Sequence, residues 1–270
     1  RCADVTGVQT CALPILCDLD GVVWRRTEPI PGSIEAINSL TADGWEVLFI
    51  TNSSHDPVEH HIERLATLGV SATGSMLTSP MAAARLCQPG ERVMCSAGPG
   101  VRLELERRGC IVVSGAIDHP EPVDVVVVGL HPEFDYGRLG VAMRAVRAGV
   151  RFIGTNSDPT FPTEAELLPG GGSILAAVST ASGVTPIIAG KPEAPMAELI
   201  ADRLGGPVDR LVMVGDRAST DGLMALAVGA EFAHVLTGVD DDPPRTTRSY
   251  DNLAAVARWL LSEGGTASGD

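Results

Sequence analysis

Two aspartates, Asp18 and Asp20, stand one residue apart directly after a short apolar run that ends at Cys17. If that run is a strand, the pair lies at its carboxyl end, where open α/β sheets place their ligand sites. One carboxylate can then act as nucleophile and metal ligand while the other acts as acid and base. Gly21 allows the sharp turn that would point both side chains into one pocket. The same spacing also occurs in calcium loops, sugar-transfer sites and ordinary turns, so the motif alone leaves the chemistry open.

Two further motifs follow apolar runs elsewhere in the chain. Thr51 and Asn52 offer a hydroxyl and backbone N–H groups that can hold a phosphoryl oxygen, although on their own they are better explained as a turn. Lys191 stands between Gly190 and Pro192 and can neutralise an anion. It is the only lysine in the chain, where the other basic residues are arginines, and this argues against a casual surface position.

The fourth motif, GDRASTD, brings two more carboxylates, Asp216 and Asp221, to the end of another apolar run. Carboxylate oxygens are preferred ligands of Mg²⁺, so this motif could hold that ion. A helix N-cap by Ser219 or Asp221 explains the same residues without a metal.

Short apolar runs alternate with helical stretches along the chain, which predicts an α/β fold. We predict strands at 13–17, 46–50, 92–96, 111–113, 123–128, 151–154, 186–189, 211–214 and 231–235. We predict helices at 33–43, 57–69, 81–86, 101–108, 136–148, 173–182, 195–204, 223–228 and 253–261. Each of the four motifs follows a predicted strand, so the fold would bring them to one edge of a sheet.

In this order the motifs resemble the haloacid dehalogenase (HAD) superfamily of phosphatases. The long interval between Asn52 and Lys191 resembles its NagD-like group (HAD-IIA, p-nitrophenyl phosphatase type), in which an α/β cap domain is inserted there. The resemblance covers the chain from Leu16 to about Leu261 and departs from the family pattern mainly at Ser219 and Gly222. The runs that carry it are DLDGVVW at 18–24, ITNSS at 50–54, TNSDPTFPTE at 155–164, LPGGGS at 168–173, AGKP at 189–192 and VGDRASTD at 214–221.

The resemblance implies an architecture of a Rossmann-like parallel-sheet HAD core with an inserted α/β cap. We expect the core at 16–80 and 187–270 and the cap at 81–186. The cap would close over the site and exclude water and large substrates. We interpret two parts of the cap as architecture first and as specificity residues second. They are the polar loop with Asn156, Asp158 and Glu164, and the run Gly170–Gly172.

The resemblance also implies how phosphate would be cleaved. Asp18 attacks phosphorus and forms an aspartyl-phosphate, and Asp20 protonates the leaving alkoxide and then deprotonates the hydrolytic water. Thr51, the Asn52 N–H and Lys191 bind the phosphoryl oxygens. The substrate would be a small phosphomonoester of the glycerol phosphate, phosphoglycolate or nucleotide class.

A magnesium site follows from the same resemblance. Asp18, the Asp20 backbone carbonyl and Asp216 would hold Mg²⁺, and Asp221 would orient Lys191 or the metal's surroundings. Two alternatives remain: a phosphoryl-transfer mutase, and a non-catalytic phospholigand-binding protein on the same fold.

Composition narrows the partners further. Acidic residues outnumber basic ones by 34 to 20, and the net charge of −14 disfavours nucleic acid and anionic membranes as partners. The longest apolar run, at about 123–130, is far short of a membrane span. Six cysteines without CxxC spacing predict reduced thiols and a cytoplasmic location. By analogy with the family we also expect pairing of copies through the cap.

Two local expectations concern the first residues and one helix. Residues 5–15, VTGVQTCALPI, resemble a translated sequencing adapter, so we expect residues 1–15 to be an artefact rather than a natural N-terminal extension. Pro14 supports this, because proline cannot donate a hydrogen bond within a central strand. His60 and His61, with Glu59 and Glu63, are interpreted as a solvated helix face rather than a metal site.

Overall fold

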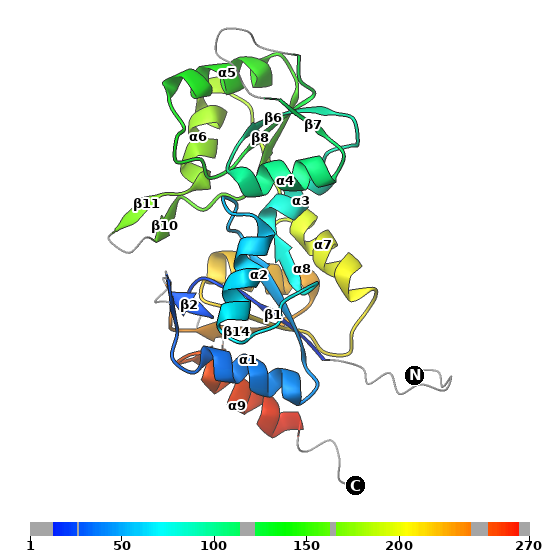
Figure 1. Ribbon diagram of the computed structural model, residues 1–270, viewed down its shortest axis with the longest axis vertical. Coiled ribbons are helices and arrows are strands. Elements are labelled where there is room, and N and C mark those ends of the chain that lie inside the picture. Colours follow the sequence, from blue (N-terminus) through cyan, green and yellow to red (C-terminus); the bar gives the residue numbers. More distant parts are fainter. Residues whose placement is uncertain (1–12, 26, 114–121, 163–165, 239–247, 265–270) are drawn as a thin grey trace.

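The computed structural model describes residues 13–25, 27–113, 122–162, 166–238 and 248–264. They form two parallel sheets, one above the other in Figure 1, each covered by helices on both faces. This is the Rossmann-like core with an α/β cap that the family resemblance implies. It is a fold of alternating strands and helices, in which right-handed crossovers place helices on both faces of a parallel sheet.

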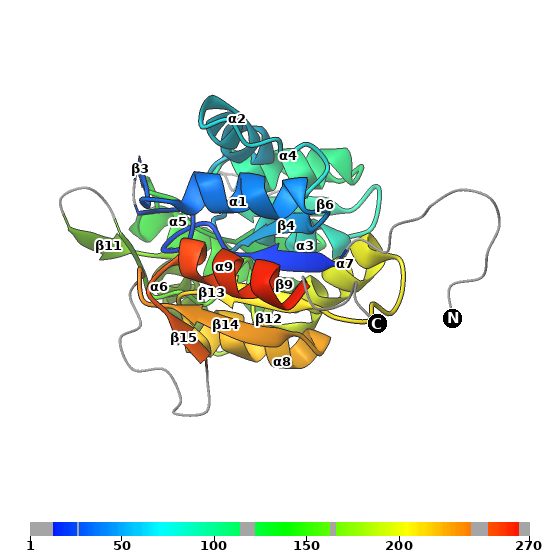
Figure 2. The same ribbon diagram turned by 90° about the horizontal axis from the view of Figure 1, so that it is seen from below.

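The first sheet has six parallel strands in the order β15-β14-β13-β1-β4-β5. Their bounds are β1 Pro14–Cys17, β4 Glu46–Thr51, β5 Met76–Thr78, β13 Val212–Gly215, β14 Glu231–Val235 and β15 Arg248–Tyr250. One face is covered by α1 Ser33–Ala42, α2 Val58–Thr67 and α9 Leu253–Gly264, of which α1 and α9 lie side by side in Figure 2. The other face is covered by α3 Ser79–Arg85, α7 Ala194–Leu204 and α8 Leu223–Val228.

The second sheet has five parallel strands in the order β12-β9-β8-β6-β7. Their bounds are β6 Arg92–Ser96, β7 Ile111–Val113, β8 Val125–Val128, β9 Arg151–Gly154 and β12 Ile187–Ile188. Its helices are α4 Pro99–Arg107 on one face, and α5 Tyr136–Arg147 and α6 Gly171–Ser182 on the other. Strand β8 is four consecutive buried valines, the composition expected of a strand that is covered on both faces.

Two short hairpins and one irregular helical turn complete the described chain. The hairpins pair β2 Trp24–Arg25 with β3 Glu28–Pro29, and β10 Thr160–Pro162 with β11 Leu167–Pro169. The β10–β11 hairpin projects from the second sheet beside the first (Figure 1). A π-helical turn, η1 Ala218–Gly222, leads into α8.

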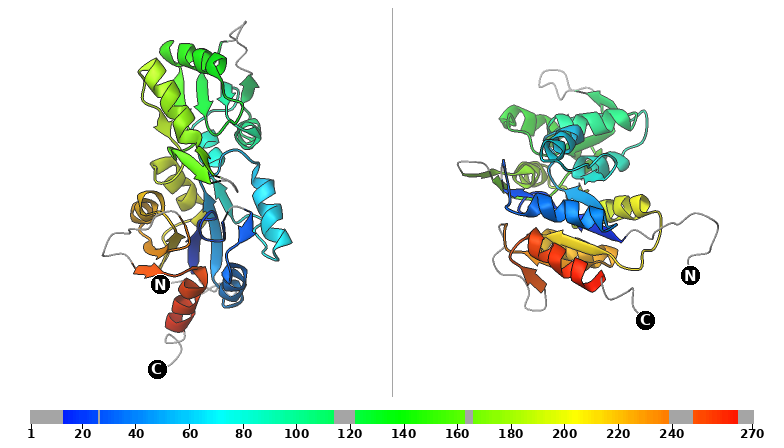
Figure 3. Two further views of the ribbon diagram at one scale, coloured as in Figure 1. Left: turned by 90° about the vertical axis from the view of Figure 1, so that its left-hand side faces the viewer. Right: turned by 60° about the horizontal axis from the view of Figure 1, so that its bottom comes forward.

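One apolar cluster joins the two sheets. It contains Leu16 and Leu48 of the first sheet, Val93 and Val125 of the second, and the alanines of α3 between them. Figure 3 shows the second unit seated directly on the first. Because the seam between the sheets is continuous core, burial of apolar surface stabilises the docked position of the cap.

Two boundary details differ from the sequence expectations. The strand predicted at 186–189 is β12, and it pairs with β9 in the second sheet, so the expected core segment beginning at 187 starts with two residues of the other sheet. Pro14 is the first residue of central strand β1, the position where a missing N–H interrupts no ladder, so it is not the misfit that we expected. The adapter interpretation stays a prediction, because residues 1–12 lie outside the described residues.

Helices α2 and α3 begin in different ways. The N-cap of α2 is Pro57, which makes no side-chain cap, and the preceding Asp56 carboxylate pairs with His55 and His60. Helix α3 begins at Ser79, and the Thr78 hydroxyl caps it by accepting from the Met81 N–H.

Candidate active site

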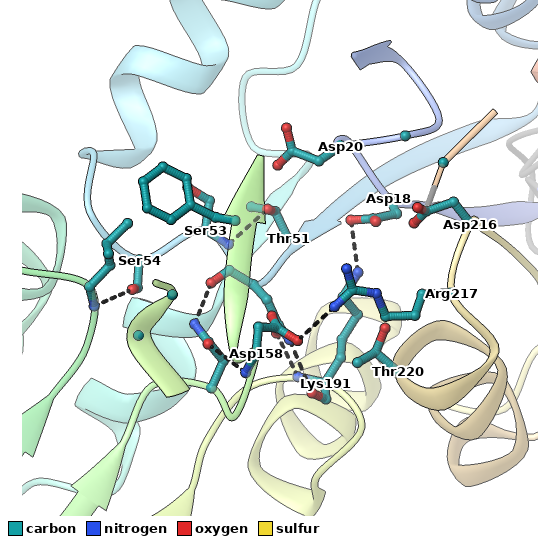
Figure 4. A pocket seen from close by; sticks show the side chains of 18 of the residues that line it. Asp18, Asp20, Thr51, Ser53, Ser54, Asp158, Lys191, Asp216, Arg217 and Thr220 are labelled. Atoms are coloured by element: carbon teal, nitrogen blue, oxygen red, sulfur yellow. Dashed lines mark hydrogen bonds and ion pairs between the residues drawn. The ribbon is translucent and has the colours of Figure 1, made fainter. Parts of the chain in front are cut away.

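The strand order explains why distant motifs meet. Strand β1 lies between β13 and β4, and all three run in the same direction, so their carboxyl ends form one edge. Asp18 follows β1, Asp216 follows β13 and Thr51 ends β4. Lys191 enters from the second sheet, three residues after β12. These residues line a pocket of about 530 Å³ between the two units (Figure 4).

Lys191 is the centre of the charged arrangement. Its ammonium lies 2.8 Å from Asp18 Oδ1 and 2.7 Å from Asp221 Oδ1, and it donates to the Ile50 carbonyl at 3.2 Å. Burial disfavours the ammonium, but the two carboxylates outweigh this and hold the pKa of Lys191 above its ordinary value. The two carboxylates thus favour the charged form of the lysine beside Asp18, which is the form that an anion-binding role requires.

Asp18 is nearly as enclosed as its partner. Burial raises the pKa of its carboxyl well above the ordinary range, while the Lys191 ammonium acts in the opposite direction. The neighbouring carboxylates Asp221 and Asp216 add to the upward shift. Such a strongly perturbed carboxyl in a pocket is typical of a functional group rather than a structural one.

Three carboxylates gather around one ammonium. Ligand oxygens of Asp18, Asp216 and Asp221 lie within 4.8 Å of one another, and all three residues are buried. Asp221 gives one oxygen to Lys191 and accepts from the Arg217 N–H with the other at 3.2 Å. The excess of buried negative charge fits a divalent cation such as Mg²⁺, with Asp18 and Asp216 as the carboxylates that could hold it.

The backbone around Asp216 is shaped to hold its carboxylate in place. A Cβ on Gly21 would stand 2.6 Å from Asp216 Cγ, and one on Gly238 would stand 1.7 Å from Asp216 Oδ2. The buried His234 ring lies 3.1 Å from the Asp216 carbonyl through Nε2. The two glycines thus let the backbone approach the Asp216 carboxylate closely and fix its place at this edge of the sheet.

Asp20 lies apart from this cluster. Its side chain is exposed to the pocket, accepts from Trp24 Nε1 at 3.0 Å, and points away from Asp18 and Asp216 in Figure 4. The guanidinium of Arg64 lies over the Trp24 ring, 3.9 Å from its centre. A carboxylate held at the pocket wall, away from the ammonium, can exchange a proton with a bound substrate.

Thr51 and Asn52 occupy the end of β4. The Thr51 hydroxyl accepts from the Ser53 N–H at 3.0 Å, and a hydroxyl that accepts can still donate its own hydrogen. The Asn52 amide pairs with the backbone of Lys191: Oδ1 accepts from its N–H at 2.8 Å and Nδ2 donates to its carbonyl at 3.1 Å. The strand-end turn and the lysine loop are therefore fastened to one another.

Comparison with known proteins decides the family. A family model described as haloacid dehalogenase-like hydrolase matches residues 15–111, and a second, HAD-hydrolase-like, matches residues 188–258. An acid sugar phosphatase of Staphylococcus aureus is 36% identical over 228 residues, which cover 83% of this chain and 86% of the relative. The chain belongs to the haloacid dehalogenase-like hydrolase family.

Solved structures of the family agree with this assignment. A p-nitrophenyl phosphatase from Archaeoglobus fulgidus superposes with a TM-score of 0.83 at 27% identity, over 92% of this chain and 99% of the other. A glycerol phosphate phosphatase from Mycobacterium tuberculosis, solved with magnesium and also with calcium, superposes with a TM-score of 0.80 at 32% identity, over 91% and 76%. These similarities confirm the predicted HAD-IIA resemblance and the predicted fold class. The chain is an enzyme, and the relatives named above are phosphatases.

The site also contains residues to which the sequence analysis gave no role in the pocket. Helix α2 turns His61 into the pocket wall, so the expected solvated face is wrong for this residue, although Glu59, His60 and Glu63 are exposed. Burial lowers the pKa of His61, and its Nε2 finds no hydrogen-bond partner among the described residues. The spacing of Val58, His61 and Leu65 on one helix face was the available signal.

Asp158 and Arg217 were undervalued as well. Asp158 comes from the loop between β9 and β10, which we interpreted as cap architecture, and Arg217 follows Asp216 directly. Their side chains form an ion pair at 3.4 Å on the pocket wall. Glu164, in the same predicted loop, lies outside the described residues.

Proposed function

We propose that this chain is a Mg²⁺-dependent phosphomonoester hydrolase that acts on a small phosphorylated metabolite through an aspartyl-phosphate. The arrangement of Asp18, Lys191 and Asp221 carries the proposal. It sets a buried carboxylate beside a buried ammonium at the edge of a parallel sheet. The phosphatase relatives support the reaction class.

In the first half of the reaction, an Asp18 oxygen attacks phosphorus and the bond from phosphorus to the substrate's ester oxygen breaks. Asp20 gives its proton to the departing alkoxide. Lys191, the Thr51 hydroxyl and the Asn52 N–H hold the phosphoryl oxygens while charge redistributes. The product alcohol leaves with the proton, and phosphate stays bound to Asp18 as an acyl phosphate.

In the second half, Asp20 takes a proton from a water molecule whose oxygen attacks the phosphorus. The bond between phosphorus and the Asp18 oxygen breaks, so inorganic phosphate leaves and both aspartates return to their starting state. Asp18, the Asp20 carbonyl and Asp216 would hold Mg²⁺, with Asp221 anchoring Lys191. When bound, Mg²⁺ supplies positive charge that lets an anionic nucleophile approach an anionic phosphate.

The pocket favours a small substrate. About 530 Å³ must hold both the phosphate and its leaving group. Phe161 and Leu167 of the β10–β11 hairpin and Leu130 of the cap give its wall an apolar side. The named relatives act on glycerol phosphate and p-nitrophenyl phosphate or are called acid sugar phosphatases, which supports this substrate class. We propose that residues of the cap determine which phosphomonoester of this class is the substrate.

Location, assembly and domain limits stay predictions. None of the helices within the described ranges is long and apolar enough to cross a membrane. The four cysteines of that part, Cys17, Cys87, Cys95 and Cys110, are unpaired, which supports the expected cytoplasmic location. We further propose that copies pair through the cap, and that the cap expected at 81–186 extends to 188, because β12 pairs with β9 of its sheet.

The test is a screen over a panel of phosphomonoesters with p-nitrophenyl phosphate as the reference. Glycerol phosphate, phosphoglycolate, sugar phosphates and nucleoside monophosphates are compared with Mg²⁺ and with EDTA. We expect Mg²⁺-dependent release of phosphate that EDTA abolishes. Phosphate binding without turnover of any ester would instead favour a non-catalytic phospholigand-binding protein. Transfer of phosphate within a sugar, without net release, would favour a mutase.

A further inference from the structure

The carboxylate of Asp158 contacts two loops of the first sheet at once, although the residue belongs to the second unit. Its Oδ2 accepts from Asn52 Nδ2 at 3.1 Å, and its Oδ1 lies 3.4 Å from Arg217 Nη1. One partner, Asn52, directly follows the strand that ends at Thr51, and the other follows the metal-site candidate Asp216. In Figure 4 Asp158 lies beside Arg217, on the side of the pocket away from Asp20.

Asn52 has little freedom left once this contact is made. Its Nδ2 is shared between Asp158 and the Lys191 carbonyl, and its Oδ1 accepts from the Lys191 N–H. Its own carbonyl accepts from Ser79 Oγ at 2.9 Å and from Asn156 Nδ2 at 2.8 Å. The side chain therefore does not reach for substrate; it fixes the direction of the backbone that follows Thr51.

The backbone of Asp158 is held in place by hydrogen bonds to other residues of the cap. Its N–H donates to Asn156 Oδ1 at 3.1 Å, and its carbonyl accepts from the Gly172 N–H at 2.9 Å. A Cβ on Gly170 would stand 2.4 Å from that carbonyl, so glycine is required for the start of α6 to press against the loop. The loop and the helix start hold the carboxylate at a defined place relative to the cap sheet.

We propose that Asp158 is a positioning residue, which orients the Asn52 turn and Arg217 only while the cap is seated on the core. This inference rests on the proposed phosphatase function and adds a residue to it. Asp158 accepts from one neutral and one cationic donor, and hydrogen bonds that involve charged groups are the stronger kind. Because it orders the phosphate-binding turn without touching phosphorus, its loss displaces groups that act on the transition state.

The experiment compares Asp158→Ala and Asp158→Asn with the wild-type protein. We expect kcat for p-nitrophenyl phosphate to fall about 10- to 100-fold in Asp158→Ala, with a smaller change in KM. The affinity for orthovanadate, measured by calorimetry with Mg²⁺ present, falls by a similar factor. Asp158→Asn keeps an acceptor for Asn52 but not the charge that faces Arg217, so it retains more activity.

Two further variants separate positioning from general destabilisation. Asp202→Asn breaks the Arg85–Asp202 ion pair, a 2.6 Å contact between α3 and α7, and leaves kcat within about twofold. The double variant of Asn52→Ala with Asp158→Ala is expected to be no slower than the slower single variant, because both changes release the same turn.

The proposal is overturned if Asp158→Ala keeps kcat and vanadate affinity within about twofold of wild type, or if its effect multiplies fully with that of Asn52→Ala. Should Asp158→Ala fail to fold, Asp158→Asn carries the same measurements. A wild-type protein that hydrolyses no phosphomonoester refutes the proposed function instead. The vanadate affinities then still decide whether Asp158 orders the anion site.

Discussion

The ammonium of Lys191 is shared by two buried carboxylates, Asp18 at 2.8 Å and Asp221 at 2.7 Å. The two partners have different tasks. Asp221 is tied by its second oxygen to the backbone of the π-helical turn, so it anchors the lysine, whereas Asp18 faces the pocket. The chain is acidic overall, with a net charge of −14, so the proposed binding of an anion relies on this local cation and on the proposed Mg²⁺.

Replacement of Lys191 by methionine is expected to cost both stability and activity. Methionine keeps much of the side-chain volume but leaves Asp18 and Asp221 without their counter-ion in a buried site. Breaking a buried ion pair in this way costs about 3–5 kcal/mol, which denaturant unfolding can measure. Turnover of p-nitrophenyl phosphate should be lost even with saturating Mg²⁺.

Arg203→Met is the matched control for that change. Arg203 pairs with Glu46 at 2.7 Å, but both side chains are about one-third exposed. Exposed pairs contribute about 0–1 kcal/mol, so this variant should unfold close to wild type and remain active. Equal stability of the two variants would show that Lys191 is not held in a desolvated pair.

Since Lys191 is the only lysine, ¹³C-lysine labelling should give one ε-carbon signal, and that signal reports its ionisation directly. The ordinary lysine pKa is about 10.4. Asp18 and Asp221 raise the pKa of Lys191 above that value in spite of burial. The signal should therefore show no deprotonation through about pH 10.4, and vanadate should shift it.

The raised pKa of Lys191 also determines how the stability of the protein depends on pH. A group with a raised folded-state pKa stabilises the fold fully below its unfolded pKa, and that contribution is lost as pH rises through the folded pKa. The contribution of Lys191 to the free energy of unfolding should therefore be lost only in strongly alkaline solution. Asp221→Asn removes one of the two carboxylates and should move the Lys191 titration downward; an unchanged titration would contradict the shared-cation arrangement.

The sequence predicted those parts of the site in which a motif directly follows a recognisable strand. Asp18, Thr51 and Asp216 follow β1, β4 and β13, and the sequence pattern shows each strand ending. Lys191 was predictable as a residue, but its strand was assigned to the wrong sheet, because β12 is only two residues long. Such a short run carries no periodicity that reveals its neighbour.

The contacts of the cap were not predictable in this way. Asp158 reaches Asn52 across 106 positions of sequence and Arg217 across 59, and nothing local in the TNSDPTFPTE run indicates either partner. The π-helical turn at Ala218–Gly222 was missed for a similar reason, since its shape follows from the bonds that Asp221 makes with Lys191 and the Arg217 N–H. The conformation at these two places is determined by tertiary contacts and not by local propensity.

Asp18→Asn should abolish turnover and at the same time stabilise the protein when Mg²⁺ is absent. Burial raises the pKa of Asp18, so its ionised form opposes folding above the unfolded pKa. The amide keeps the shape and removes the charge. We expect a loss of kcat of about 10⁴-fold or more and a gain in Tm of about 2–4 °C for each kcal/mol relieved. Mg²⁺-dependent activity in this variant would refute Asp18 as the nucleophile.

Gly21→Ala should weaken metal binding as well as the fold. Gly21 has φ +84°, a left-handed conformation that costs an L-residue about 1–2 kcal/mol. Its new Cβ would also stand 2.6 Å from Asp216 Cγ, so the carboxylate must move. We expect the Mg²⁺ concentration for half-maximal activity to rise about 10- to 100-fold, as for changes that misorient a metal ligand.

Gly44→Ala separates those two effects. Gly44 has φ +92°, and a Cβ there would meet nothing within 4 Å, so the variant carries the backbone cost alone. Its unfolding free energy should fall by about 1–2 kcal/mol, which is less than the loss in Gly21→Ala, while its Mg²⁺ requirement stays at the wild-type value. If both variants shift the Mg²⁺ requirement equally, the effect comes from stability, and the close approach of Gly21 to Asp216 does not shape the metal site.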